Sequence, residues 1–131
     1  MTRAYTIEPI GVIRSPIRSR SEAPKQGCES GVEGQLVVEE RFREAFPGLA
    51  PGQKVVILYW LHLASRDCLQ VHPRGDVSRP LRGVFSTRSP DRPNPIGIEL
   101  VEILKIEGTT ITVRGLDAVD GTPLIDIKCD V

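Results

Sequence analysis

A short stretch of the chain concentrates the side chains best suited to bind a ligand. Gly83–Gly97 reads GVFSTRSPDRPNPIG and carries Arg88, Arg92 and Asn94. Its three prolines fix their own φ angles and bias each preceding residue towards extended backbone, so the loop is expected to be rigid. Guanidinium and amide donors held in a rigid loop suit recognition of a carboxylate, a phosphate or a base edge. The alternative is a stiff connection between strands whose arginines are only solvated.

A second candidate is the stretch Leu116–Lys128, which reads LDAVDGTPLIDIK. Its DGTP sequence predicts a turn, after which a strand begins. Two carboxylates here, Asp117 and Asp120, have the chemistry to hold the hydroxyls or an amine of a ligand. Composition favours the simpler interpretation, in which both aspartates only form turns.

The histidines and cysteines argue against a metal site. Cys28, Cys68 and Cys129 are odd in number and form no C-x-x-C pair, a pattern that disfavours a disulfide framework or a zinc finger and suits a reducing cytosol. His62 and His72 make no local metal-binding pattern. His62 directly follows an apolar run and is interpreted as a hydrogen-bonded core histidine rather than as a ligand or a base. We expect no metal.

Several common nucleotide and catalytic motifs are missing from the sequence. No G-x-G occurs, so neither the dinucleotide fingerprint nor the equivalent loop of Rossmann methyltransferases is present. The chain also has no phosphate-binding G-x-x-x-x-G-K-[ST] and no G-x-S-x-G nucleophile elbow. Any cofactor must therefore bind to a fold of another kind.

The elements that must position these residues are mostly strands. Alternating or continuous apolar segments predict the strands Tyr5–Ile13, Val32–Val38, Gln53–Leu61, Leu69–Val71, Gly83–Ser86, Ile98–Ile106, Ile111–Val113 and Leu124–Ile127. The one convincing helix is Glu39–Phe46, which is closed by Pro-Gly. With 11 prolines and 12 glycines between short strands, the chain is expected to be mainly β, an antiparallel barrel or twisted sheet with one or two short helices.

Two longer irregular stretches, 15–31 and 73–97, are where we expect the chemistry. The second contains the arginine–proline loop already described. The apolar run of Gln53–Leu61 has the length of a buried strand, but it would serve as well at an interface between subunits.

Length and charge limit the classes of function. The 131 residues are enough for one domain with its own hydrophobic core. Seventeen basic and seventeen acidic residues cancel, which excludes capture of nucleic acid by net charge alone. A basic face is still available, because 77–98 carries an excess of three positive charges. No apolar segment has the length of a membrane span or of a signal peptide, so a cytoplasmic protein is expected.

Four motifs taken in order resemble one family. They are IGVIRSP at 10–16, PKQG at 24–27, GVFSTRSPDRPNPIG at 83–97 and LDAVDGTPLIDIK at 116–128. The chain is similar from about residue 5 to residue 128 to the TsaA-like family, whose members are tRNA adenine N(6)-methyltransferases that use S-adenosylmethionine. The R-P-N-P-I-G core of the third motif is its most specific part. The resemblance implies one domain over 1–131 with a core of about 5–128.

The resemblance also implies a fold, a cofactor and partners. The expected protein is a small β-barrel that binds S-adenosylmethionine without a Rossmann fold and works as a homodimer with the cofactor near the subunit interface. Its expected substrate is N(6)-threonylcarbamoyladenosine, the hypermodified adenosine next to the anticodon of tRNA. Carried over by position, the cofactor contacts are Pro24, Lys25, Gln26, Leu61, His62, Arg88, Leu116, Asp117, Ala118 and Val119.

Methyl transfer to this substrate needs help, because a carbamoylated adenine nitrogen has a delocalised lone pair and is a poor nucleophile. We hypothesise that Asn94, or a backbone carbonyl near Pro95, accepts the hydrogen bond of the substrate N–H. Arg88 and Arg92 would then orient the threonyl carboxylate or a phosphate. The general base is left open between Asp117 and His62.

One departure from the family weakens the tRNA interpretation. Longer members continue after the D-I-K strand with a C-terminal region that helps to grip tRNA, whereas this sequence has three residues after Lys128 and is expected to lack that extension. Zero net charge does not compensate, because affinity for a polyanion depends on the phosphates neutralised. The alternatives are a non-catalytic module that binds S-adenosylmethionine, or a methyltransferase that acts on a small molecule or another RNA.

Overall fold

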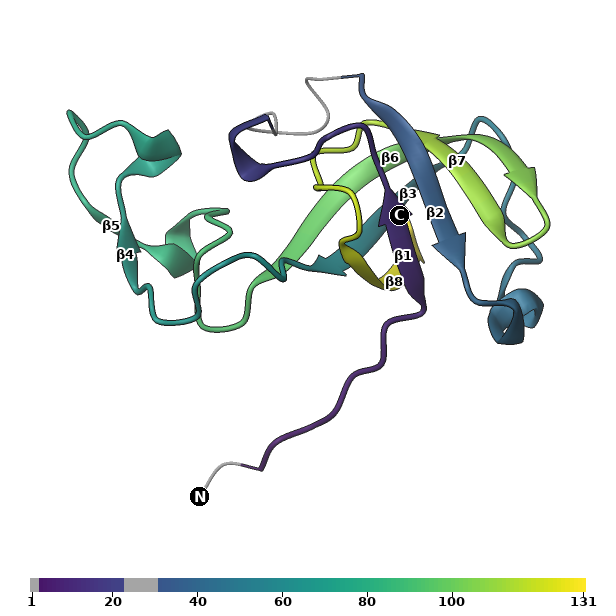
Figure 1. The fold of residues 1–131 in the computed structure, drawn as a ribbon, viewed down its shortest axis with the longest axis horizontal. Coiled ribbons are helices and arrows are strands. Elements are labelled where there is room, and N and C mark those ends of the chain that lie inside the picture. Colours follow the sequence, from purple (N-terminus) through teal and green to yellow (C-terminus); the bar gives the residue numbers. More distant parts are fainter. Residues whose placement is uncertain (1–2, 23–30) are drawn as a thin grey trace.

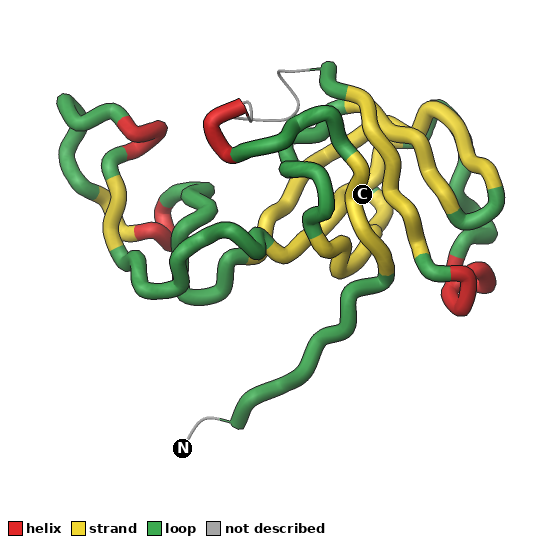
Figure 2. The backbone as a smooth tube through the Cα atoms, in the orientation of Figure 1, coloured by secondary structure: helices red, strands yellow, loops and turns green. Residues whose placement is uncertain are grey.

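The computed structural model describes residues 3–22 and 31–131. In this part of the chain six strands form a closed antiparallel barrel in the order β1-β2-β7-β6-β3-β8 (Figures 1 and 2). These strands are β1 (Gly11–Arg14), β2 (Glu33–Val38), β3 (Lys54–Trp60), β6 (Ile96–Glu107), β7 (Thr110–Arg114) and β8 (Pro123–Cys129). The expected mainly β fold with antiparallel strands is confirmed.

The barrel interior is filled by side chains from every strand. Along β3, Val55, Ile57 and Tyr59 point inward and are buried, whereas the residues between them are half-buried on the outer face. The continuous apolar run therefore behaves as an alternating strand. Aliphatic residues of the other strands complete the core: Ile13, Leu36, Val38, Val101, Ile103, Ile111, Val113 and Leu124.

The predicted first strand, Tyr5–Ile13, is too long at its N-terminal end. Ladder pairing begins at Gly11. Ile10 still donates its N–H to the Leu124 carbonyl and accepts from the Glu39 N–H, whereas residues 3–9 form an extended arm that runs away from the barrel (Figure 1). Pro9 explains the break, because proline has no N–H to donate to a ladder. Tyr5 and Ile7 are exposed on this arm.

Two other predicted elements take a tighter form. Instead of an α-helix over Glu39–Phe46, the chain forms a 3-10 helix, η3 (Glu40–Ala45), whose ends are closed by i to i+3 hydrogen bonds. The predicted strand Gly83–Ser86 is likewise replaced by a short strand and a 3-10 turn, η5 (Val84–Ser86). There the Ser86 hydroxyl donates to the Gly83 carbonyl, and such local bonds compete with strand pairing.

Residues 61–95, which connect β3 to β6, leave the barrel and form a side lobe (Figure 1). The lobe contains the two-stranded ribbon β4 (Gln70–Val71) and β5 (Arg82–Gly83) and the 3-10 turns η4 (Pro73–Gly75) and η5. Most of the rest is loop (Figure 2). The lobe closes at its base, where the Leu61 N–H donates to the Pro95 carbonyl at 2.7 Å. No helix in the described part of the chain is long and apolar enough to cross a membrane.

Replacing Ile57 by alanine tests whether the barrel depends on its filled interior. Ile57 is fully buried at the centre of β3, so Ile57→Ala is expected to lower the free energy of unfolding by about 2–5 kcal/mol. Urea unfolding followed by circular dichroism measures the loss. The matched control is Leu58→Ala, which removes a half-buried side chain from the outer face of the same strand. Equal losses for the two variants would contradict this account of the core.

Candidate functional site

Strand register brings the sequence motifs to one end of the barrel. The last residue of β3, Trp60, pairs with the first residue of β6, Ile96, and the last residue of β7 pairs with the first of β2. Three segments therefore start or finish at this end. They are the lobe, the loop after β7 (residues 115–122) and the early loop between β1 and β2, of which residues 15–22 and 31–32 are described. We call it the loop end.

Asp120 ties the loop after β7 to the early loop. Its Oδ1 accepts a hydrogen bond from the Ser15 N–H at 3.0 Å, and the guanidinium groups of Arg14 and Arg18 lie 3.7 and 3.5 Å from Oδ2. The predicted turn at Asp120 is thus also a tether between segments that lie 105 residues apart in sequence.

A second tether connects the early loop to the lobe. Arg20, in the 3-10 turn η1 (Arg20–Glu22), donates to Asp91 at 3.1 Å and to the Leu63 carbonyl at 3.4 Å. The other Asp91 oxygen accepts from the Ser65 N–H at 2.9 Å. Partial burial alone would raise the pKa of Asp91, but the Ser65 hydrogen bond and the positive charge of Arg20 outweigh it and hold this pKa below its ordinary value of 3.8.

At the base of the loop end a carboxylate is held by a buried tyrosine. The Tyr59 hydroxyl donates to Asp117 Oδ1 at 2.5 Å, and the Tyr59 side chain is almost fully buried. Burial is the main cause that raises the pKa of Tyr59 far above its ordinary range, and the negative charges of Asp117 and Glu99 add to it. The positive charge of Arg88 acts in the opposite direction, which places Arg88 within electrostatic range of the same group.

The predicted cofactor contacts occupy three segments, two of which the structure describes at the loop end. In the loop after β7, Leu116 and Ala118 point into the core, while Asp117 and Val119 are half-buried. In the lobe, Leu61 is half-buried, and His62 and Arg88 are exposed. The third segment, Pro24, Lys25 and Gln26, lies outside the described residues.

His62 was expected to be a core histidine, and that interpretation is wrong. The apolar run ends with the barrel at Trp60, so His62 lies beyond it in the lobe and is exposed.

Arg92 is largely engaged by its own loop. Nη1 donates to the carbonyls of Thr87 and Ser89 at 3.1 and 3.0 Å, and Nη2 donates to the Val84 carbonyl at 3.0 Å. These bonds brace the arginine–proline loop from inside. Because a guanidinium has five N–H donors, two remain after these three bonds.

Asn94 also has a protein partner. Its Oδ1 accepts a hydrogen bond from Arg66 at 2.8 Å, while Nε of Arg66 donates to the Pro93 carbonyl at 2.7 Å. The Arg66 guanidinium lies 5.3 Å from the centre of the Trp60 ring. Arg66 thus fixes the end of the arginine–proline loop against the end of β3, and the second lone pair of Asn94 Oδ1 is the one a substrate N–H would use.

Sequence reasoning missed Tyr59, Arg20 and Asp91. Tyr59 was counted only as part of the apolar run. The signal that could have identified it is its hydroxyl, which needs a hydrogen-bond partner once the side chain is buried. Arg20 and Asp91 gave no local signal, because their contact joins residues 71 positions apart.

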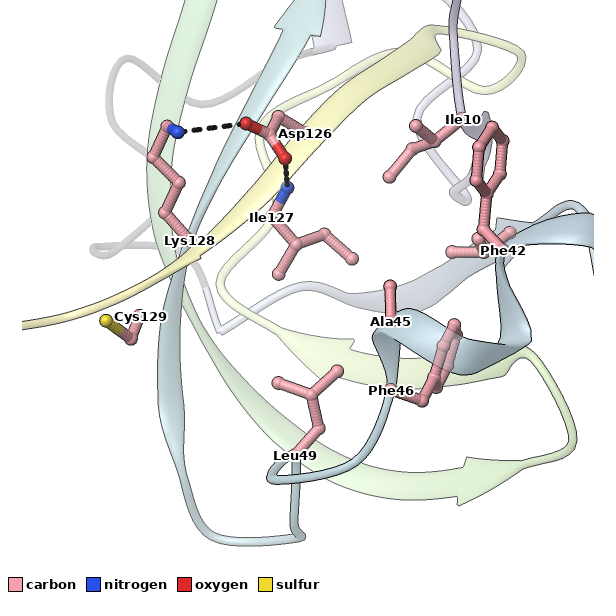
Figure 3. A pocket seen from close by; sticks show the side chains of 10 residues that line it. Ile10, Phe42, Ala45, Phe46, Leu49, Asp126, Ile127, Lys128 and Cys129 are labelled. Atoms are coloured by element: carbon pink, nitrogen blue, oxygen red, sulfur yellow. Dashed lines mark hydrogen bonds and ion pairs between the residues drawn. The ribbon is translucent and has the colours of Figure 1, made fainter.

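A separate apolar cavity lies at the opposite end of the barrel (Figure 3). It has a volume of about 160 Å³ and lies between η3 and the last residues of β8, next to the start of β3. Figure 3 shows Asp126 beside it, bonded to Lys128 and to the Ile127 N–H. None of the predicted site residues lines this cavity. Among the described residues, no group of three or more His, Cys, Asp or Glu side chains is placed to hold a metal ion.

A family model for the tRNA-methyltransferase O N-terminal domain matches residues 12–131. The chain belongs to this family.

Relatives of the chain are named for binding S-adenosyl-L-methionine. The probable S-adenosyl-L-methionine-binding protein of Methanothermobacter thermautotrophicus is 52% identical over 122 residues, which cover 93% of this chain and 87% of that protein. The S-adenosyl-L-methionine-binding protein of Archaeoglobus fulgidus is 43% identical over 122 residues, which cover 93% of this chain and 86% of that one.

The fold is shared with solved tRNA-methyltransferase O structures. The crystal structure of TrmO from Pseudomonas aeruginosa superposes with a TM-score of 0.80 at 31% identity over the whole of this chain. The chain covers 56% of the length of that structure and thus spans a little over half of it.

Within this member of the tRNA-methyltransferase O family, Asp91 is expected to make the stability of the loop end depend on pH. Because its pKa is lowered on folding, its stabilising contribution is complete above the ordinary pKa and is lost as pH falls through the lower, folded-state value. The difference in unfolding free energy between wild type and Asp91→Asn should be constant above about pH 5 and shrink below about pH 4. Urea titrations over this range measure it.

The control for that measurement is Asp67→Asn, which alters an exposed aspartate of the same lobe and should cost less stability at neutral pH. A pH-independent difference for Asp91→Asn would contradict the assigned role.

Proposed function

We propose that this chain binds S-adenosyl-L-methionine at the loop end and transfers its methyl group to tRNA, on N6 of threonylcarbamoyladenosine next to the anticodon. The observation that carries the proposal is the convergence of the motif-bearing loops. The Ser15–Asp120, Arg20–Asp91 and Tyr59–Asp117 contacts draw the early loop, the lobe and the loop after β7 together. A cytoplasmic location would follow from such a substrate.

The side chains at the loop end fit the cofactor chemically. S-adenosyl-L-methionine carries an ammonium group, a carboxylate and two ribose hydroxyls. The Asp117 carboxylate is suited to accept from the ammonium group or the hydroxyls, and the exposed Arg88 guanidinium is suited to bind the carboxylate. Leu61 supplies half-buried apolar surface at the start of the lobe. Main-chain groups of Leu116, Ala118 and Val119 would complete the cradle, with His62, Pro24, Lys25 and Gln26.

When bound, S-adenosyl-L-methionine would supply a methyl group from its positively charged sulfur to the substrate nitrogen. The nitrogen electron pair would form the new N–C bond, the S–C electron pair would stay on sulfur, and the N–H proton would be released to a base. The protein contributes alignment and a dry site. In our proposal Asn94 accepts the substrate N–H hydrogen bond, and the two remaining Arg92 donors orient the threonyl carboxylate. Because our proposal assigns Asp117 to the cofactor, His62 is the remaining candidate for the base.

The lobe supplies the positive charge that a tRNA partner requires. Residues 61–95 hold six arginines and three aspartates, an excess of three, in a chain whose net charge is zero. Several of these arginines, among them Arg74, Arg79 and Arg82, are exposed. Because phosphate contacts dominate affinity for nucleic acids, positive charges concentrated on the lobe would bind tRNA although the net charge of the chain is zero.

We also propose that the protein works as a homodimer through the lobe. Phe85 is 85% exposed and Val77 is 80% exposed, and Leu69 and Leu81 are exposed on the same lobe. Four large apolar side chains on one small lobe are typical of an interaction surface. Since Arg88 lies three residues after Phe85, a subunit packed there would adjoin the cofactor site.

A non-catalytic module that binds S-adenosyl-L-methionine is the second candidate. It is favoured by the hydrogen bonds that already occupy Arg92 and Asn94, because side chains engaged in bracing a loop need no role in transfer. It would share the cofactor site and differ only in having no methyl acceptor.

Isothermal titration with S-adenosyl-L-methionine, followed by transfer of its radiolabelled methyl group to tRNA, separates the two candidates. Micromolar binding with labelling of tRNA that carries threonylcarbamoyladenosine, and none of tRNA that lacks it, supports the proposed enzyme. Binding without labelling supports the module. Arg88→Ala should weaken cofactor binding about tenfold, the value of one charged hydrogen bond. Arg82→Ala, an exposed arginine of the same lobe, is the control and should leave the affinity for the cofactor unchanged.

Sedimentation velocity tests the homodimer. Wild type should sediment as twice the chain mass of 14.4 kDa, and Phe85→Asp should shift it to the monomer, because a buried unpaired charge opposes association. Lys105→Asp, on β6 at the far end of the barrel, is the control and should stay dimeric. A monomeric wild type at assay concentration would refute this part of the proposal.

A further inference from the structure

Tyr59 and Asp117 form a partly buried side-chain contact at the loop end. Asp117 Oδ1 accepts the 2.5 Å hydrogen bond from the tyrosine, and Tyr59 is 3% exposed while Asp117 is half-buried. Asp117 lies in a loop without regular structure, whereas Tyr59 belongs to a strand paired on both sides. The contact therefore anchors an irregular loop to a strand of the barrel.

A glycine on the neighbouring strand leaves space for the Tyr59 ring. Gly97 pairs directly with Tyr59 across β3 and β6, and a Cβ added to Gly97 would lie 2.3 Å from the tyrosine ring. On its other side, the pairing of β3 with β8 shifts register between Leu58 and Tyr59. A phenylalanine ring would need the same room beside Gly97, so the hydroxyl and its hydrogen bond to Asp117 are what tyrosine adds at this position.

We propose that Tyr59 is a positioning residue of the cofactor site, which orients the Asp117 carboxylate for an ammonium group or a hydroxyl pair of the ligand. This inference rests on the proposed function. With one oxygen held by Tyr59, the carboxylate keeps Oδ2 and one lone pair of Oδ1 for the ligand. The rotation of a loop aspartate is thereby restricted before the ligand arrives, which lowers the entropy lost on binding.

Charges on the surrounding elements fit this arrangement. Glu99, buried on β6, and Asp117, on the loop after β7, place negative charge beside Tyr59, and Arg88 of the lobe places positive charge there. A ligand with both an ammonium group and a carboxylate would meet one partner of each sign. Tyr59 stays neutral throughout and acts only as a donor to Asp117.

The test is Tyr59→Phe, which removes the hydroxyl and keeps the ring. We expect the dissociation constant for S-adenosyl-L-methionine, measured by isothermal titration, to rise about tenfold. In the methyl-transfer assay the KM for the cofactor should rise with kcat nearly unchanged, because the substrate side of the site is untouched. The control is Tyr5→Phe, which alters the only other tyrosine, exposed on the arm, and should change nothing.

A double-mutant cycle distinguishes positioning from a merely structural role. If Tyr59 acts through Asp117, then Tyr59→Phe should have less than a twofold effect on cofactor affinity in the Asp117→Ala background. Effects that multiply in the double variant would overturn the inference, since a general loss of packing would weaken binding with or without the carboxylate. Unchanged affinity in Tyr59→Phe alone would also overturn it.

The failure of this inference and the failure of the proposed function give different results. If wild type does not bind S-adenosyl-L-methionine, the proposed function fails and this inference fails with it. If wild type and Tyr59→Phe bind the cofactor equally, only the positioning role fails. Thermal denaturation of each variant verifies that the proteins compared are folded.

Discussion

Closure of a six-stranded sheet into a narrow barrel is the constraint on which the rest of the structure depends. The join between β1 and β8 is short, with two paired positions, Gly11 with Leu124 and Val12 with Pro123. It is enough to remove the open edges of the sheet. A barrel of this size has an interior just wide enough for its own side chains, and Ile13, Ile57 and Ile103 fill it without exposure to solvent. A ligand has no place inside the barrel, and the cofactor site that we propose is therefore built from loops.

The loops are held in place by polar contacts as well as by Leu116 and Ala118, the core residues of the loop after β7. The early loop, the lobe and the loop after β7 are connected by a small set of polar contacts that involve Asp120, Asp91 and Asp117. In each case a carboxylate accepts from a main-chain N–H, a guanidinium or a hydroxyl. Hydrogen bonds to charged groups are stronger than neutral ones, which suits segments that lie mostly outside the barrel core.

In the arginine–proline loop, the side chains that we propose to contact the substrate also stabilise the loop itself. Its prolines stiffen the backbone, and Arg92 donates three hydrogen bonds to the carbonyls that those turns leave without ladder partners. Arg66 likewise donates hydrogen bonds to the Pro93 carbonyl and to the Asn94 side chain. In the proposed site, the donors left for a substrate are those that the loop does not use for its own hydrogen bonds, and Arg88 is the exposed arginine of this loop.

Much of the fold was predictable because strand patterning is local. The alternation of apolar residues located β2, β3, β6, β7 and β8 to within about two residues, and glycine and proline punctuation marked the turns. The structure differs from the expectation at two places. Residues 5–9 have strand composition but join no ladder of the barrel. The helix expected over Glu39–Phe46 forms as the 3-10 helix η3, because so short a segment gains little from α-helical hydrogen bonding.

The sequence by itself determined the alternation of the barrel strands, the stiffness of the loop at 83–97 and the order of the motifs, all of which follow from residues close together along the chain. Only the tertiary structure decided which side chains are free to act. Tyr59 meets Asp117 across 58 residues and Arg20 meets Asp91 across 71, and no local pattern encodes such pairs. The physical reason is that a hydrogen bond depends on the distance between atoms, and that distance is set when the barrel closes.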